Sequence, residues 1–164
     1  MGLETERRFI VKGDDWKIYT KEYENIYQGY LITDREGWTI RVRVINEAES
    51  WLTLKYPYSD ISKYEFEYLI PLADAMEIMK ITNYQVTKKR YKLNLKPGDW
   101  IVDCFSKKNY PLVLAEVELD SPDQIIQKPK WCDKEVTGVE ELSNASLAKC
   151  PISNWTMDKE RSIL

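Results

Sequence analysis

Eight short stretches in which charged and apolar residues alternate are the feature of this sequence that most constrains its fold. Alternation with a period of two is typical of a β-strand, because successive side chains point to opposite faces of the sheet. The stretches are rich in aromatic and β-branched residues, as strands are. We therefore predict strands over residues 3–11, 24–33, 38–46, 50–57, 63–70, 84–93, 99–105 and 112–120.

Turn residues and short polar segments separate most of these strands. They fall at residues 34–37, 46–50, 97–98 and 107–109, and such short connections favour antiparallel neighbours. Helices are predicted over residues 14–21, from 72 to about 79 after Pro71, and over 143–149. We expect one mainly β domain over residues 1–164, with the structure of the tail, 153–164, left open.

Charged side chains that share a strand face are largely segregated by sign from strand to strand. Two carboxylates share a face on the first, fifth and eighth strands, whereas two cations share a face on the third and sixth. The residues concerned are Glu4, Glu6 and Arg8; Arg41 and Arg43; Lys55; Glu65 and Glu67; Lys88 and Arg90; Asp103; and Glu116 and Glu118.

Two interpretations of these faces remain open on the residues alone. The charged faces could be the solvated side of a small barrel, similar in outline to a lipocalin, in which case Arg41→Glu would change little. If the sheet closes with the charged faces inward, cations and carboxylates meet in a tunnel, where isolated charge is costly without a ligand. Arginine and lysine would then bind phosphate oxygens, and grouped carboxylates would hold metal ions.

The absence of histidine excludes several kinds of catalytic site. It removes Ser-His and Cys-His pairs, the imidazole general base and most catalytic zinc sites. A metal here is held mainly by oxygen, which favours Mg²⁺ or Mn²⁺. The attacking group is then expected to be a water molecule oriented by metal or carboxylate.

Net charge and cysteine content limit which binding partners and which cellular compartment we expect for this chain. A net charge of −3 and a pI near 5.2 give no overall attraction to nucleic acid or to an anionic membrane. Three widely spaced cysteines, Cys104, Cys132 and Cys150, lack the pairing of a disulfide scaffold and favour a reducing cytoplasm. No window is long and apolar enough to span a bilayer. The oligomeric state stays open, a homodimer included.

The first strand resembles the opening Glu-x-Glu-x-Lys motif of the CYTH domain, or triphosphate tunnel metalloenzyme, family. Glu4-Thr5-Glu6-Arg7-Arg8 carries this resemblance. The likeness continues, in the family's order, over about residues 3–148. The further segments are Gln28-Gly29-Tyr30-Leu31, Arg41-Val42-Arg43, Leu52-Thr53-Leu54-Lys55, Glu65-Phe66-Glu67-Tyr68, Lys88-Lys89-Arg90-Tyr91, Trp100-Ile101-Val102-Asp103, Ala115-Glu116-Val117-Glu118-Leu119 and Lys134-Glu135-Val136-Thr137.

The resemblance implies a closed eight-stranded antiparallel tunnel that binds triphosphate-containing small molecules and two divalent metal ions. It also implies roles for the charged residues. The metal ligands would be Glu4, Glu6, Glu116 and Glu118. The phosphate-binding residues would be Arg8, Arg41, Arg43, Lys55, Lys88 and Arg90. The catalytic set would be Arg8 together with Glu65, Glu67 and Asp103, whose carboxylates would orient water or a second metal.

This chain departs from the family pattern at two places. Arg8 stands where the family has lysine, so a forked guanidinium replaces a compact ammonium. After Gly138 the chain has Val139, Glu141 and Leu142, where family members often carry an acidic residue and an Arg-Tyr pair. A phosphate contact from this C-terminal region is therefore in question.

The activity predicted from the resemblance is hydrolysis of inorganic triphosphate with Mg²⁺ or Mn²⁺. The alternatives are a thiamine or nucleoside triphosphatase, a class IV adenylate cyclase-like enzyme, and a module that binds polyphosphate without turning it over. The cyclase ranks below the triphosphatases, because no residue is evident as a base for the 3′-hydroxyl of ATP.

Overall fold

Nine strands and three α-helices make up most of the part of the chain described by the computed structural model, residues 2–34, 37–59 and 61–164. The strands are β1 (Gly2–Val11), β2 (Thr20–Thr33), β3 (Thr39–Ile45), β4 (Glu49–Pro57), β5 (Ser62–Leu69), β6 (Tyr84–Leu93), β7 (Asp99–Phe105), β8 (Val113–Glu118) and β9 (Cys132–Glu135). The α-helices are α1 (Leu72–Ile81), α2 (Asn144–Lys149) and α3 (Met157–Ile163). Short 3-10 helices cover Asp15–Tyr19, Lys107–Asn109, Glu140–Leu142 and Ile152–Asn154.

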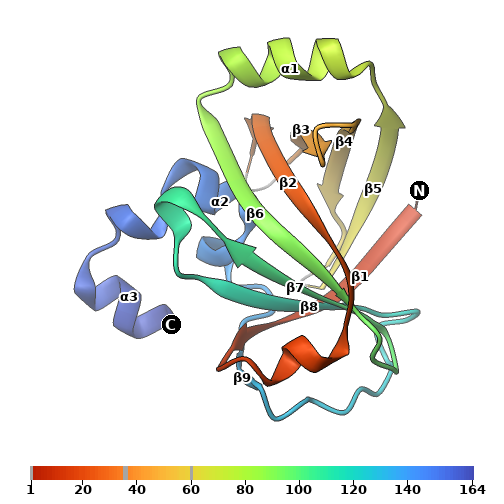
Figure 1. The fold of residues 1–164 in the computed structure, drawn as a ribbon, viewed down its shortest axis with the longest axis vertical. Helices are drawn as coiled ribbons and strands as arrows, with labels where there is room; N and C mark the ends of the chain where they lie inside the picture. Colours follow the sequence, from red (N-terminus) through yellow and green to blue (C-terminus); the bar gives the residue numbers. More distant parts are fainter. Residues whose placement is uncertain (1, 35–36, 60) are drawn as a thin grey trace.

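The strands form one antiparallel sheet that closes on itself (Figure 1). Its order is β5-β4-β3-β2-β6-β7-β8-β1-β9, and a further pairing of β5 with β1 completes a ring of eight strands within the described residues. The short β9 pairs with β1 alongside this ring. The predicted closed eight-stranded antiparallel barrel is confirmed.

The predicted strands match the observed ones to within a few residues at each end. The one larger difference is β2, which begins at Thr20 rather than at residue 24. The predicted first helix is a single 3-10 turn, and Asp14 makes no side-chain capping bond to it. Ser143 does cap α2, because its hydroxyl accepts a hydrogen bond from the backbone N–H of Ser146. The turn predicted at 34–37 lies partly outside the described residues.

The apolar outer faces of the barrel are covered by segments between the strands. Phe9, Trp100 and Val117 face outward and are buried against Trp16 and Trp131, which come from the connections after β1 and before β9. On the other side, α1 lies across the barrel (Figure 1) and packs on β3 and β4, with Ala75 buried against Val42 and Val44. These contacts fix the apolar face of each strand on the outside of the barrel. The charged face of the same strand must then point into the barrel, because the two faces of a strand are opposite.

One end of the barrel interior is filled by the residues that follow β9. Phe105 and Leu114 share strand faces with the inward-pointing Asp103 and Glu116, and they pack against Leu142 and Leu147 around α2. Both leucines are fully buried. We call residues 136–149 the plug segment. A cavity remains between it and the strands. Within the described part of the chain, no helix is both long and apolar enough to cross a bilayer.

Candidate active site in the tunnel

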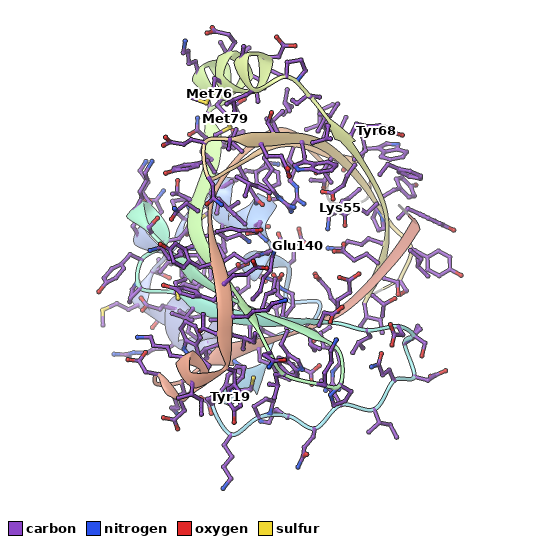
Figure 2. All side chains as sticks on the ribbon, turned by 45° about the vertical axis from the view of Figure 1, so that its right-hand side comes forward. Tyr19, Lys55, Tyr68, Met76, Met79 and Glu140 are labelled. Carbon is purple, nitrogen blue, oxygen red and sulfur yellow. The ribbon has the colours of Figure 1, made fainter. Side chains whose placement is uncertain are left out.

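The charged strand faces point into the barrel and meet around a central opening. Viewed along the tunnel, Lys55 projects into this opening, and Glu140 of the plug segment lies across from it (Figure 2). A cavity of about 550 Å³ is lined in part by Glu4, Glu6, Arg8, Arg41 and Lys55. Lys88, Arg8, Arg41 and Asp103 keep 7% or less of their surface exposed. The alternative in which the charged faces are solvated is therefore wrong.

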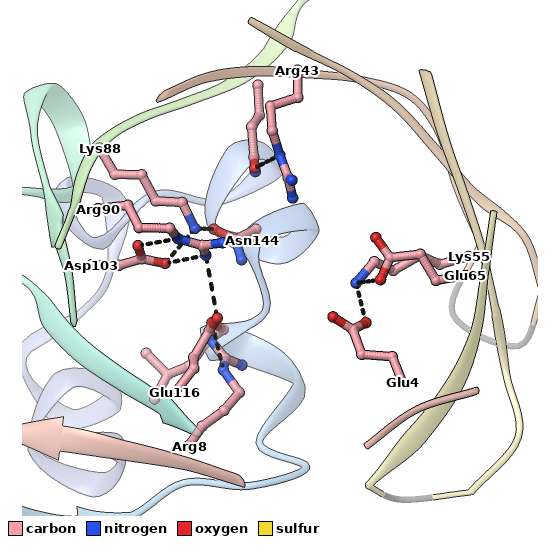
Figure 3. A network of polar contacts seen from close by, with 12 residues as sticks. Glu4, Arg8, Arg43, Lys55, Glu65, Lys88, Arg90, Asp103, Glu116 and Asn144 are labelled. Carbon is pink, nitrogen blue, oxygen red and sulfur yellow. Dashed lines mark hydrogen bonds and ion pairs between the residues drawn. The ribbon is translucent and has the colours of Figure 1, made fainter. Parts of the chain in front are cut away.

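On one side of the tunnel, β1, β6, β7 and β8 carry a tightly bonded group that we call the packed wall: Arg8, Lys88, Arg90, Asp103 and Glu116 (Figure 3). The fully buried Asp103 is its centre. Lys88 Nζ lies 2.5 Å from Asp103 Oδ2, and Arg90 donates from Nε and Nη2 to the two carboxylate oxygens, both at 2.8 Å. Arg90 Nη2 also reaches Glu116 Oε2 at 3.3 Å.

These contacts shift the ionisation of the packed wall. Burial would raise the pKa of Asp103, but Arg90 and Lys88 outweigh it and hold that pKa below its ordinary value. Burial lowers the pKa of Lys88 to about 8, and the charge of Arg90 adds to this effect against the opposing Asp103. Asp103 thus stays ionised at neutral pH. Lys88 is a cation that loses its proton a little above neutral pH.

Arg8 joins the packed wall to the plug segment. Its Nε lies 3.2 Å from Glu116 Oε1, and its Nη2 donates to the backbone carbonyl of Leu142 at 2.6 Å. Burial and Asp103 would raise the pKa of Glu116, yet Arg8, Lys88 and Arg90 together lower it. Glu116 therefore stays ionised in the middle of the tunnel.

The opposite side, on β3, β4, β5 and the start of β1, holds a looser group that we call the open wall: Glu4, Arg41, Arg43, Lys55, Glu65 and Glu67. Lys55 Nζ lies 2.9 Å from Glu65 and also contacts Glu4. Arg41 approaches Glu65 and Glu67 only at 3.6 and 3.7 Å. Figure 3 shows Lys55, Glu4 and Glu65 facing the packed wall across an open space.

Arg41 is the residue of the open wall whose hydrogen-bond donors most lack acceptors. It is 6% exposed, and its buried Nε and Nη2 make no hydrogen bond within the described structure. Beside it, Arg43 donates to Gln28 at 3.1 Å. Burial lowers the pKa of Arg43 to about 10, and the charges of Arg41 and Arg90 contribute to the shift. Buried donors without acceptors and mutually repelling guanidinium groups are surroundings that an anion placed between the walls would stabilise.

The carboxylates at the start of β1 and the end of β8 repel one another, and the cations near them do not balance their charge. Glu6 and Glu118 are direct cross-strand partners. Burial, then Glu116 and Glu4, raise the pKa of Glu6. Burial, then Glu4, Asp99 and Glu65, raise the pKa of Glu118. A cation close to these oxygens would relieve the repulsion, as a divalent metal ion does.

The donor set therefore fits Mg²⁺ or Mn²⁺ in its chemistry, since all of its ligand atoms are carboxylate oxygens. Among the described residues, no three carboxylates or thiols stand together in a metal-binding arrangement. The reason is visible in the contacts: Glu4 is held by Lys55, and Glu116 is held by Arg8 and Arg90. Glu6 and Glu118 have no such partners in the described structure, so they are the donors already available.

The structure brings all thirteen sequence-predicted residues to the tunnel or its acidic end, and it adds several that the sequence analysis missed. Asn144 of α2 accepts from Lys88 Nζ at 2.9 Å. Gln28 donates to the Tyr30 hydroxyl at 2.9 Å, and Thr53 donates to Glu67 at 2.9 Å. Strand alternation could have placed Gln28 and Thr53 on the inward face. For Asn144 the alternation carries no signal, because it lies on a helix.

Comparisons with known proteins agree with this geometry. The model of the CYTH domain family matches residues 2–149. A protein of Acetivibrio thermocellus named inorganic triphosphatase is 39% identical over 158 residues, which cover 94% of this chain and 99% of that protein. The solved structure of the inorganic triphosphatase NE1496 has a TM-score of 0.64 and 30% identity, covering 88% of this chain and 93% of that one. The PH1012 protein of Pyrococcus horikoshii shares the fold, with a TM-score of 0.58 at 22% identity, over 73% of this chain and 81% of that one.

Proposed function

The chain belongs to the CYTH domain family, and from that premise we propose that it is a metal-dependent hydrolase of inorganic triphosphate. One observation of the tunnel carries the proposal. Arg41 holds two buried nitrogen donors without acceptors, and it lines the same cavity of about 550 Å³ as Glu4 and Glu6. A linear triphosphate supplies many acceptor oxygens and several negative charges. The inorganic triphosphatase names of the Acetivibrio relative and of NE1496 support the same substrate.

The two walls would bind the phosphate chain from opposite sides. On the open wall, Arg41, Arg43 and Lys55 offer donors to phosphate oxygens. On the packed wall, Lys88 and Arg90 present charges held in place by Asp103, and Arg8 lines the cavity beside them. Because each cation of the packed wall is already positioned by a carboxylate, these cations would need little side-chain rearrangement to bind phosphate.

The residues that would hold the metal are Glu4, Glu6, Glu116 and Glu118, with Mg²⁺ or Mn²⁺ as the expected ions. A bound divalent ion would neutralise phosphate charge and make a phosphorus atom more open to attack. Glu6 and Glu118 already lack cation partners in the described structure. Lys55 would exchange Glu4 for a phosphate oxygen when substrate binds, which frees the Glu4 carboxylate.

Hydrolysis requires one water molecule to attack a terminal phosphorus and one phosphoanhydride bond to break, releasing phosphate and diphosphate. We propose that Glu65 and Glu67 orient this water, because they lie on the open wall beside Arg41. Asp103 was predicted to share this role, and it remains a prediction. Its two oxygens already bind Lys88 and Arg90, so we assign it mainly the positioning of these two cations.

The same proposal covers organisation and compartment. We treat residues 1–164 as a single domain that acts on a small molecule, without nucleic acid or membrane, and that functions as a monomer or a homodimer. The cysteines Cys104, Cys132 and Cys150 are all free, which is consistent with a cytoplasmic setting.

The test is phosphate release from tripolyphosphate, ATP and thiamine triphosphate, each with Mg²⁺ or Mn²⁺. We expect wild-type protein to prefer tripolyphosphate, and Glu6→Ala and Arg41→Ala to lose this activity. Arg7→Ala is the matched control, since Arg7 follows Glu6 on β1 but binds Glu135 on the outer face. A preference for an organic triphosphate would change the substrate assignment. Tight binding of tripolyphosphate without turnover under either metal would replace the enzyme with a binding module.

A further inference from the structure

The plug segment forms part of the tunnel surface as well as filling one end. Thr137, Gly138, Glu140, Ser143 and Asn144 all line the same cavity as the strand residues. The position of this segment therefore sets the size of the cavity and the place of Asn144. Apolar side chains pack it against the barrel, and three of its hydrogen bonds to the barrel strands involve a single residue.

That residue is Arg8, which binds the plug segment in three ways. Its backbone carbonyl accepts from the N–H of Val136 at 2.8 Å. Its backbone N–H donates to the hydroxyl of Thr137 at 3.0 Å. Its guanidinium Nη2 donates to the carbonyl of Leu142 at 2.6 Å, while Nε holds Glu116 on the other side. Arg8 thus joins the first strand of the site to the segment that closes it.

The fork of arginine suits this double contact, because two of its nitrogens point to separate acceptors at fixed spacing. Lysine carries its three donors on a single nitrogen, so it could hold both acceptors only if Glu116 Oε1 and the Leu142 carbonyl oxygen lay within reach of that one atom. The Leu142 carbonyl is deep in an apolar cluster with Leu147 and Leu114, where losing its donor is costly.

The contact continues to Lys88, one of the residues proposed to bind phosphate. Two residues after Leu142, the side chain of Asn144 accepts from Lys88 Nζ at 2.9 Å. A shift of the Leu142 carbonyl would carry Asn144 with it, because both belong to the short run that leads from a 3-10 turn into α2. Lys88 would then lose one of its two acceptors and keep only Asp103.

We propose that Arg8 is a positioning residue that fixes the plug segment against the tunnel wall and, through Leu142 and Asn144, fixes the ammonium group of Lys88. This role is additional to any contact of Arg8 with phosphate. It rests on the proposed triphosphate function for its effect on substrate, but the anchoring itself concerns the protein without ligand.

Amide hydrogen exchange of the full-length chain, without metal or phosphate, tests the anchoring. In Arg8→Met, the amides of residues 139–147 exchange about tenfold faster than in wild type, because one charge-assisted hydrogen bond is lost. Arg8→Lys gives an intermediate increase and serves if the methionine variant folds poorly. The control is Arg7→Met, a change on the same strand as Arg8, which breaks the ion pair with Glu135 of β9 and leaves these amides unchanged. Exchange in Arg8→Met and Arg8→Lys equal to wild type would overturn the proposal.

A double-mutant cycle tests the connection to Lys88. The dissociation constant of tripolyphosphate is measured by calorimetry for Arg8→Lys, Asn144→Ala and the double variant. If Arg8 acts through Asn144, the double variant loses at least about threefold less affinity than the product of the single losses. Losses that multiply would show that Arg8 acts independently, which contradicts the proposal. Failure of wild type to hydrolyse tripolyphosphate would refute the proposed function, while the exchange measurement would still decide the anchoring.

Discussion

The two walls of the tunnel contain similar charges but hold them differently. On the packed wall, Asp103 receives three hydrogen bonds from Lys88 and Arg90 at 2.5 to 2.8 Å and is completely buried. On the open wall, Arg41 lies 3.6 Å or more from Glu65 and Glu67 and keeps two buried nitrogens without acceptors. The charged groups of the packed wall have partners within the wall, whereas the open wall keeps hydrogen-bond donors without acceptors.

This difference separates stability from ligand binding. Breaking a satisfied buried network leaves uncompensated charge inside the protein, which is strongly destabilising. An unsatisfied buried donor adds no stability to the folded state, and it gains most when an anion binds. The comparison therefore predicts that the packed wall controls folding and the open wall controls the affinity for phosphate.

The largest effect is expected from Asp103→Ala. The substitution leaves Lys88 and Arg90 as buried cations without their main acceptor, and we expect a loss of about 3–5 kcal/mol in the free energy of unfolding. Urea denaturation measures it. Glu67→Ala on the open wall is the matched carboxylate deletion, with an expected loss of about 1 kcal/mol, since its ion pairs with Arg41 and Arg43 are longer and its side chain is partly exposed. Equal losses would remove the distinction between the walls.

Arg41→Met is expected to show the reverse behaviour. Removing the guanidinium eliminates the unpaired donors, so kcat/KM for tripolyphosphate falls about 100-fold, which corresponds to about 2.7 kcal/mol. The free energy of unfolding stays within about 1 kcal/mol of wild type, because a well-packed apolar side chain replaces a poorly paired charge. Steady-state kinetics and urea denaturation on the same preparation check both parts. Lost stability with retained affinity would contradict the assignment.

The two lysines provide a comparison by pH. Burial lowers the pKa of Lys88 to about 8, whereas on the open wall burial is outweighed by Glu4 and Glu65, which raise the pKa of Lys55. NMR of ¹³Cε-labelled lysine should show Lys88, identified by its loss in Lys88→Met, titrating near pH 8 and Lys55 above 10.5.

The sign of the stability change follows from proton binding. Between pH 8 and 10.5 the unfolded chain keeps the Lys88 proton while the folded chain loses it, so this residue's contribution to stability rises with pH. Over the same range the packed wall loses a positive charge, and KM for tripolyphosphate should increase. A Lys88 midpoint above 10 would show that Asp103 compensates its burial.

Thr53→Val should give the smallest effect. Thr53 is completely buried and donates one hydrogen bond to Glu67 at 2.9 Å. Valine keeps the shape and removes the donor, so we expect a loss of about 1 kcal/mol in stability and a modest rise in KM, since Glu67 becomes less well placed. Thermal unfolding and kinetics measure these changes. A loss as large as that of Asp103→Ala would show that the open wall is also a structural network.

The sequence predicts the barrel and the inward charges well because strand alternation needs only local information. Arg41 and Arg43, for example, must share a face whatever their partners are, and Glu65 and Glu67 must do the same. The pairing of charges depends instead on which strands are neighbours after closure. That Arg90 and Lys88 both bind Asp103 follows from the register of β6 on β7, which the sequence alone does not specify.

The plug segment shows why part of the site could not be predicted. Its contact with Arg8 uses the carbonyl of Leu142, and a backbone oxygen has no residue type that reveals it. Asn144 lies on a short helix whose apolar residues gave only a weak helical pattern. The second departure from the family pattern, at Val139 and Leu142, is explained in part: Leu142 is fully buried and seals the end of the barrel.

The place of β1 between β5 and β8 determines when the protein can become functional during its synthesis. Arg8 and Glu116 are 108 residues apart in the chain, so the first strand must wait, unpaired on that side, until β8 has emerged from the ribosome. Until then its carboxylates and cations face water. Ring closure is therefore a late step that buries the charges and assembles the site together. A nascent chain that stops before β8 has neither buried charges nor an assembled site. A ligand that binds only the closed ring would favour closure of the ring.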